Sequence, residues 1–210
     1  ISNIDLEIPK GQVFGYLGPN GAGKTTTIKL LLDFIRPTNG TAKIFGLDIR
    51  QNSVDIKEKI GYLPGDIVLY DHMTGAELLK YFSYLRKQSD WQFVTNLAKR
   101  LDVNLEIKIK KMSRGNRQKL GLIQAFMHRP ELIIMDEPSS GLDPLLQQEF
   151  YTMVDEVRSD GRTIFISSHI LPEVERICDQ VGIIRDGRLI TVEQVSRLRD
   201  RSLQELEIHF

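Results

Sequence analysis

One short segment, "GPNGAGKTT" at residues 18–26, constrains the fold more than any other part of the chain. It follows the apolar run "QVFGYL" (12–17) and precedes the apolar helical pattern "TTTIKLLLDFI". Glycines at this spacing let backbone N–H groups converge on an anion at the positive end of a helix. The segment therefore predicts a phosphate-binding P-loop between a β-strand and an α-helix.

The residues of this loop have separable predicted roles. Lys24 is expected to reach the terminal phosphates of a nucleotide as a catalytic residue, and the Thr25 hydroxyl is expected to bind Mg²⁺. The other nucleotide-binding positions are predicted to be Gly18, Pro19, Asn20, Gly21, Ala22, Gly23, Lys24, Thr25 and Thr26. The alternative is a glycine-rich turn with a solvated lysine, and the flanking strand and helix argue against it.

Apolar runs of strand length alternate with helical patterns along the chain. Four runs are interpreted as buried strands, at residues 12–17, 131–136, 162–167 and 180–185. Two others, "ISNIDLEI" (1–8) and "TAKIFGLDI" (41–49), alternate more openly and predict a small antiparallel β subdomain. With 41% hydrophobic and 27% charged residues, we expect an α/β fold with a mostly parallel central sheet and a packed core.

The middle of the chain has helical rather than strand character. Thr74 and Glu77 form a capping-box pattern that predicts a helix start. The apolar face of this helix is expected to consist of Leu78, Leu79, Phe82 and Leu85. A second helix is predicted at 90–101, with an apolar face of Phe93, Leu97 and Leu101. We interpret 1–210 as one domain, with an α-helical subdomain (66–128) inserted into a core (1–65 and 129–210).

Charge and cysteine content exclude several classes of protein. The Lys+Arg and Asp+Glu counts are both 28, so no global field draws the chain to nucleic acid or to an anionic membrane. The longest aliphatic runs fall far short of the roughly 20 residues that a membrane span needs. Cys178 is the single cysteine and is expected to be buried. Because the chain opens on Ile1 without a leader, we interpret it as an excised domain.

Two carboxylates follow the buried run "LIIM" in "LIIMDEP". Asp136 suits a magnesium-binding role, and Glu137 is positioned to take a proton from an attacking water as general base. Capping of the next helix is the alternative role, but Asp143 before Pro144 is a better cap. His169 in "IFISSHI" follows another strand at the same sheet edge, where it is predicted to contact the γ-phosphate as a catalytic residue. A structural role at the strand end is the alternative.

Together with the P-loop, the segments "IIMDEPSSGLDP", "SSH" and "MSRGNRQKLGL" resemble the nucleotide-binding domain of ATP-binding cassette (ABC) transporters over nearly the whole chain. In that family "MSRGN" (112–116) aligns with the signature loop, usually written LSGGQ, and "SSGLD" (139–143) looks like the D-loop. The resemblance implies a P-loop NTPase fold and an ATPase that uses ATP and Mg²⁺. It adds nucleotide-binding residues, namely Ser113, Gly115, Asn116 and Asp143.

The resemblance also implies a second nucleotide-binding domain as partner, expected to be a homodimer. Each ATP would lie between the P-loop of one copy and the signature loop of the other, as two-fold symmetry demands. Ser113 and the N–H groups near Gly115, at the start of a predicted helix, would meet the partner's γ-phosphate. Hydrolysis would remove these contacts and let the two halves separate.

Three features depart from the family pattern. The signature has Met112, Arg114 and Asn116 in place of the usual Leu, Gly and Gln. Arg114 either adds charge near the phosphates or points to solvent. Gly65 stands where the family has a magnesium-contacting glutamine, so either Asp66 substitutes as a metal ligand or the sensor is lost. The adenine-stacking aromatic residue normally precedes the segment that begins at Ile1, and weakened nucleotide affinity would follow from its absence.

A membrane permease is the other partner that the resemblance implies, with the cassette bound at the cytoplasmic face of the cell membrane. "YLPGD" and "RGNRQKLGLIQA" look like cassettes of exporters for drugs, antibiotics, lipids or polysaccharides. A coupling helix of the permease is predicted to dock on residues 66–75, unless their apolar side chains pack inward: Ile67, Val68, Leu69 and Tyr70.

Two other functions remain as alternatives. One is a soluble ABC ATPase acting on ribosomes or DNA, and the other is a P-loop switch with slow hydrolysis. The balanced charge and the single cassette argue against the first, and we expect no nucleic-acid partner. Glu137 argues against the second, because a switch needs no strong base.

Overall fold

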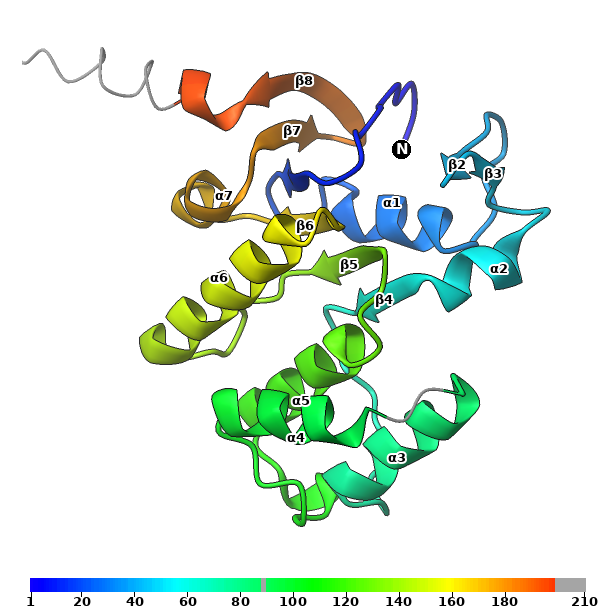
Figure 1. The fold of residues 1–210 in the computed structure, drawn as a ribbon. Coiled ribbons are helices and arrows are strands. Elements are labelled where there is room, and N and C mark those ends of the chain that lie inside the picture. The colour runs from blue at the N-terminus through cyan, green and yellow to red at the C-terminus, as the bar shows by residue number, and fades with distance from the viewer. Residues whose placement is uncertain (88–89, 199–210) are drawn as a thin grey trace, which may run out of the picture.

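The structure, a computed structural model that describes residues 1–87 and 90–198, is built around a six-stranded sheet (Figure 1). Its strands, in spatial order, are β4 (Ile60–Leu63), β5 (Leu132–Asp136), β6 (Thr163–Ser168), β1 (Val13–Leu17), β7 (Gln180–Arg185) and β8 (Arg188–Gln194). All neighbouring pairs are parallel except β7 and β8. The predicted mostly parallel sheet is therefore confirmed.

Helices cover both faces of this sheet. Figure 1 shows α1 (Lys24–Leu31) and α2 (Ser53–Glu58) on one face, and α6 (Pro144–Ser159) and α7 (Leu171–Ile177) on the other. The central strands β5, β6 and β1 are almost entirely buried on both sides, as parallel strands usually are. In β6, for example, Phe165 belongs to the core cluster beneath α1, whereas Ile164 and Ile166 belong to the cluster beneath α6.

The predicted helical middle contains α3 (Gly75–Leu85), α4 (Trp91–Arg100), a 3₁₀ turn (Ile109–Lys111) and α5 (Arg114–Phe126). The capping box is confirmed, since Thr74 Oγ1 accepts from Glu77 N at 3.2 Å and Glu77 Oε2 accepts from Thr74 N at 2.7 Å. Leu78 and Leu79 are buried as expected. The expectation for Leu85 was wrong: its side chain is exposed, at the last residue of α3, beyond the part of the helix that the other helices cover.

Polar contacts connect this helical group to the rest of the chain. Arg100, at the end of α4, donates to Glu149 and to both carboxylate oxygens of Glu156 on α6, at 2.5–2.8 Å. Gln118, buried on α5, donates to the carbonyl of Pro138 at 3.0 Å. These contacts fix α4 and α5 relative to the loop and helix that follow β5.

The predicted antiparallel β subdomain is smaller than expected. Residues 41–49 form a hairpin, β2 (Lys43–Ile44) and β3 (Leu47–Asp48), joined by Phe45 and Gly46 at positive φ. Residues 1–8 do not form a strand. Their alternation has another cause: Ile4, Leu6 and Ile8 pack against the core without joining a sheet. Cys178 is buried, as expected.

No helix within the described residues is long and apolar enough to span a membrane.

Candidate active site

Three neighbouring strands deliver the predicted catalytic residues to one edge of the sheet. The spatial order β5, β6, β1 places Asp136 beside Ser167, and Leu17 beside Ser168. Glu137, His169 and Gly18 each follow the carboxyl end of one of these strands. The parallel topology therefore brings together residues that are more than one hundred positions apart in the sequence.

The P-loop has the backbone conformation that its glycines predict. Gly23 precedes the first turn of α1 with a φ of 107°, in a region that L-residues other than glycine rarely adopt. A Cβ atom at Gly18 would lie 2.3 Å from the carbonyl oxygen of Ile184, so no larger residue fits there without movement. The exposed part of the loop consists of Pro19, Asn20, Gly21, Thr25 and Thr26, whereas Ala22 and Lys24 are buried.

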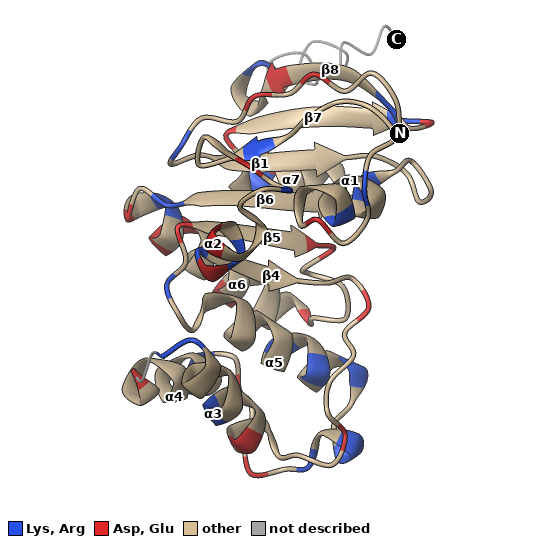
Figure 2. Cartoon of the chain, turned by 90° about the vertical axis from the view of Figure 1, so that its right-hand side faces the viewer, with Lys and Arg blue, Asp and Glu red and all other residues tan. Residues whose placement is uncertain are grey.

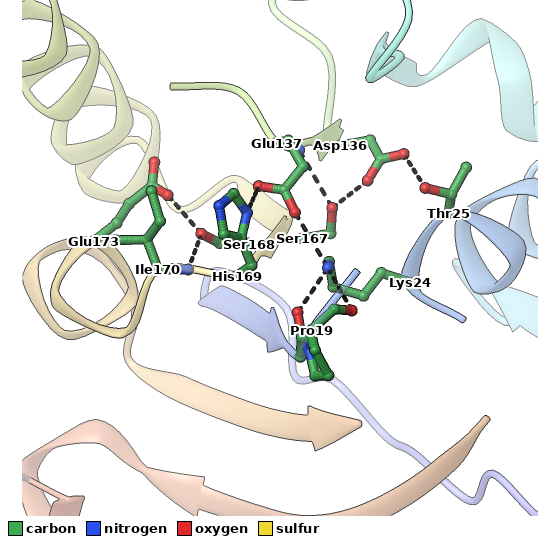
Figure 3. Close-up of polar contacts among 11 residues, drawn as sticks. Pro19, Lys24, Thr25, Asp136, Glu137, Ser167, Ser168, His169, Ile170 and Glu173 are labelled. Carbon is green, nitrogen blue, oxygen red and sulfur yellow. Dashed lines mark hydrogen bonds and ion pairs between the residues drawn. The ribbon is translucent and has the colours of Figure 1, made fainter. Parts of the chain in front are cut away.

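Lys24 lies at the centre of the cluster (Figure 3). Its ammonium donates to the carbonyls of Gly18 at 2.7 Å and Pro19 at 3.2 Å. It also forms an ion pair with Glu137 Oε1 at 3.2 Å, although the geometry of this contact is not that of a hydrogen bond. Only 5% of the residue is exposed. Groups of the chain itself therefore hold Lys24 in place.

Asp136 is held by two hydroxyl groups. Thr25 Oγ1 donates to Asp136 Oδ2 at 2.6 Å, and Ser167 Oγ donates to Asp136 Oδ1. Burial, with a smaller effect from the charge of Asp136, raises the pKa of Tyr62 to about 12. Ser167 was not identified from the sequence, although it stands in the "SSH" segment quoted for His169.

The donor set at Asp136 fits Mg²⁺. The Thr25 hydroxyl and the Asp136 carboxylate are hard oxygen ligands, and Mg²⁺ takes its other ligands from substrate phosphates and water. Among the residues that the structure describes, no three His, Cys, Asp or Glu side chains form a complete metal site. A Cβ at Gly65 would lie 3.3 Å from Asp136 Oδ2, so the backbone approaches the carboxylate closely there, while Asp66 is exposed.

Glu137 is held in a strained conformation between two partners. Its φ of 52° lies in the left-handed region, which costs a residue with a side chain roughly 1–2 kcal/mol. The carboxylate faces Lys24 through Oε1 and His169 Nδ1 through Oε2, the latter at 2.8 Å. Its N–H donates to the carbonyl of Ser167 at 3.1 Å. Strain supported by surrounding contacts is typical of functional positions.

The predicted signature residues lie apart from this cluster. Ser113 is the N-cap of α5, and its Oγ accepts from Asn116 N at 3.2 Å. Ser113 and Arg114 are exposed, and Gly115 and Asn116 are partly exposed. A Cβ at Gly115 would lie 3.0 Å from the carbonyl of Gly141 in the predicted D-loop. Within the described residues, these four positions form no hydrogen bond or ion pair with the P-loop.

Asp143, predicted as both a helix cap and a nucleotide contact, caps α6. Its Oδ1 accepts from the N–H groups of Leu145 and Leu146, each at 3.1 Å. The residue is exposed. The capping role is confirmed, and the nucleotide contact stays a prediction.

Comparisons with known proteins identify the family to which this site belongs. The sequence pattern of the family described as "ABC transporter" matches residues 1–140. The chain is 36% identical to "Bacitracin transport ATP-binding protein BcrA" of Enterococcus faecalis, covering 99% of this chain and 68% of that protein. It is 34% identical to "ABC transporter ATP-binding protein NatA" of Bacillus subtilis, covering 90% of this chain and 80% of that protein.

A solved structure described as "Structure of ATP binding subunit of ABC transporter" superposes with a TM-score of 0.85 at 29% identity, covering 94% of this chain and 87% of that one. The predicted P-loop NTPase architecture is thereby confirmed. The chain belongs to the ABC transporter family, as an ATP-binding cassette with ATPase activity.

Proposed function

We propose that two copies of this cassette bind ATP between them and that hydrolysis powers an exporter in the cell membrane. One observation supports the proposal: the two regions that are predicted to contact the nucleotide do not meet within the described residues of one chain. The strand-end cluster around Lys24 and Glu137 is connected within the chain, whereas Ser113 and Gly115, at the start of α5, form no hydrogen bond or ion pair with that cluster among residues 1–87 and 90–198. A head-to-tail pair would bring each region to the other.

In this proposal Glu137 is the general base. The Lys24 ammonium transfers from the Glu137 carboxylate to the terminal phosphates, which frees that carboxylate to accept a proton from water. The water oxygen bonds to the γ-phosphorus, and the bond to the bridging oxygen breaks, giving ADP and inorganic phosphate. His169 orients the Glu137 carboxylate through Nδ1 and contacts the γ-phosphate. Mg²⁺, held by Thr25 and Asp136, would neutralise phosphate charge.

The proposed membrane partner has a surface to dock on. Residues 66–75 split in their exposure: Val68 and Tyr70 face solvent, whereas Ile67 and Leu69 pack against the core. The inward-packing alternative therefore holds for Ile67 and Leu69, and docking on the exposed Val68 and Tyr70 stays a prediction. The exposed apolar side chains continue onto α3 with Tyr81, Tyr84 and Leu85. Beside them, a groove is lined by Phe34, Tyr62, Pro64 and Arg86. An amphipathic helix of a permease would bury this surface.

The kind of substrate is proposed from a relative. BcrA is named as a bacitracin transport protein, and export of a drug, lipid or polysaccharide by this chain's permease is the corresponding proposal. The cassette would then lie at the cytoplasmic face of the membrane. Recovery of the native protein from membranes with a multi-span subunit would support this function. Recovery with ribosomes or DNA, and no such subunit, would replace it with the soluble alternative.

The variant Glu137→Gln tests the hydrolytic part directly. It removes the base but keeps the size and shape of the side chain, so kcat should fall by roughly 10²–10⁴-fold. ATP would still bind, and the ATP-bound pair should accumulate as a dimer in size-exclusion chromatography. The control is the same variant without nucleotide, which should elute as a monomer. A variant that stays monomeric at saturating ATP contradicts the shared-site proposal.

A further inference from the structure

Beside the Glu137 and His169 pair lies a third acidic residue, one that the sequence did not single out. Glu173 lies on α7, four residues after His169, and is 3% exposed. Acidic residues are rarely this buried unless they are hydrogen-bonded, because removing a carboxyl from water is costly. The two other buried positions of α7 are apolar, Val174 and Ile177. An apolar residue at position 173 would pack equally well, so packing alone does not explain a glutamate there.

The carboxyl of Glu173 is connected to the chain on both sides of His169. Ser168 Oγ, immediately before His169, donates to Glu173 Oε2 at 2.6 Å. The same hydroxyl accepts from the N–H of Ile170, immediately after His169, at 3.0 Å. Figure 3 shows these contacts reaching from α7 to the end of β6. Ser168 is itself fully buried.

Glu173 also interacts with the loop that carries Glu137. The Ser139 hydroxyl, two residues beyond Glu137, is buried beside the Glu173 carboxyl and lowers its pKa. Burial raises the pKa of Glu173, and the Ser168 and Ser139 hydroxyl groups act in the opposite direction. Glu173 Oε1 has no partner with hydrogen-bond geometry in the described part of the chain. The side chain therefore stays in a costly position between two loops that each deliver one member of the Glu137 and His169 pair.

We propose that Glu173 is a positioning residue for hydrolysis: through Ser168 it fixes the backbone on both sides of His169 and so holds His169 Nδ1 against the Glu137 carboxylate. The inference rests on the proposed role of Glu137 as base. Glu173 does not touch the substrate in this account. Its effect reaches the reaction through the 2.8 Å contact between His169 and Glu137.

The test compares Glu173→Leu with Glu173→Gln in steady-state ATP hydrolysis. Leucine fills the volume but cannot accept from Ser168, so kcat should fall by at least about tenfold, about 1.4 kcal/mol of transition-state stabilisation. KM for ATP should change by less than about twofold, because the ATP-binding residues are untouched. Glutamine keeps an acceptor oxygen and should restore most of kcat. Glu175→Leu, on the same helix, is the matched control and should leave kcat unchanged.

The variant Ser168→Ala removes the same contact from the other side. It should reproduce the kcat loss of Glu173→Leu, and it keeps the inference testable if the leucine variant does not fold, as judged by circular dichroism and thermal unfolding. Wild-type kcat in Ser168→Ala, or equal losses in the leucine and glutamine variants, would overturn the positioning role. A wild-type chain that does not hydrolyse ATP would instead refute the proposed function, so the two failures are distinguishable.

Discussion

Lys24 and Ser113 represent the two regions of this chain that are predicted to contact ATP, and their surroundings differ. The Lys24 ammonium is buried and touches two backbone carbonyls and one carboxylate of its own chain. Ser113 is exposed, and its hydroxyl accepts from Asn116 N in the first turn of the helix that it caps. Figure 2 shows basic residues, drawn in blue, on α5 and on the neighbouring turn, away from the strand ends. The first region is thus arranged within the single chain, whereas the second forms no polar contact with the first among the residues that the structure describes.

This difference indicates that one region binds ATP in the single chain and that the other contributes only when two chains pair. A cluster whose polar groups are already held in place can receive ATP with little reorganisation, because its ordering is part of folding. A helix start with free N–H groups gains its interaction only when an anion is brought to it. We therefore expect substitutions around Lys24 to weaken ATP binding by single chains. Substitutions around Ser113 should reduce ATP hydrolysis, which needs paired chains, without changing that affinity.

The largest effect on ATP binding should come from Lys24→Ala. Loss of a charge-assisted contact with the phosphates is worth about 1.5–3 kcal/mol, so the Kd for ATP should rise by roughly 10–150-fold. The measurement is a titration with a fluorescent ATP analogue on protein dilute enough to remain monomeric. Lys29→Ala, an exposed lysine in the last turn of α1, is the control and should bind normally. If the Kd for ATP is unchanged in Lys24→Ala, the region around Lys24 does not bind ATP in the single chain, and the proposed difference between the two regions is wrong.

A smaller effect, confined to pairs, is expected for Ser113→Asp. Aspartate is as good a helix cap as serine, so α5 should stay folded, while its charge would repel the partner's phosphate. ATP hydrolysis should fall by about tenfold or more, equivalent to about 1.4 kcal/mol, with no change in ATP affinity of the dilute monomer. Ser113→Asn provides a neutral cap and should retain most of the activity. A loss of monomer affinity in Ser113→Asp would show that the second region acts within one chain.

The smallest effect is expected for Arg114→Ala. The Arg114 side chain is exposed, and an exposed charge near phosphate is screened by salt. Hydrolysis should fall by no more than about threefold at low salt, and the difference from wild type should disappear as the salt concentration rises. A large, salt-independent loss would instead place Arg114 in direct contact with the nucleotide.

Local patterns predicted much of the fold and of the candidate site. The P-loop, the Thr74 capping box and the Asp143 cap each depend on residues within a few positions of one another, and the structure has each of them. Four core strands were placed within one residue of their ends. Residues 1–8 were misassigned because apolar alternation reports which side of a segment is buried, and not whether a neighbouring strand is present.

Features that depend on long-range contacts were missed. Strands β4 and β8 were not predicted, although the Asp186–Gly187 turn before β8 is a hairpin signal. Ser167 and Glu173 have roles only because β5, β6 and α7 meet at one edge of the sheet. A single serine or glutamate in a sequence has no signal of this kind, since its importance comes from partners about thirty residues away or from burial after folding.

Mixing two impaired variants tests the shared site most directly. In a mixed pair of Lys24→Ala and Ser113→Asp chains, one site contains both substitutions and the other contains neither. Equal amounts pairing at random should restore about a quarter of wild-type ATP hydrolysis, because half of the pairs carry one intact site out of two. Each variant alone, at the same total concentration, is the control. If the mixture stays at the background of the separate variants, the two regions do not complete one site across two chains.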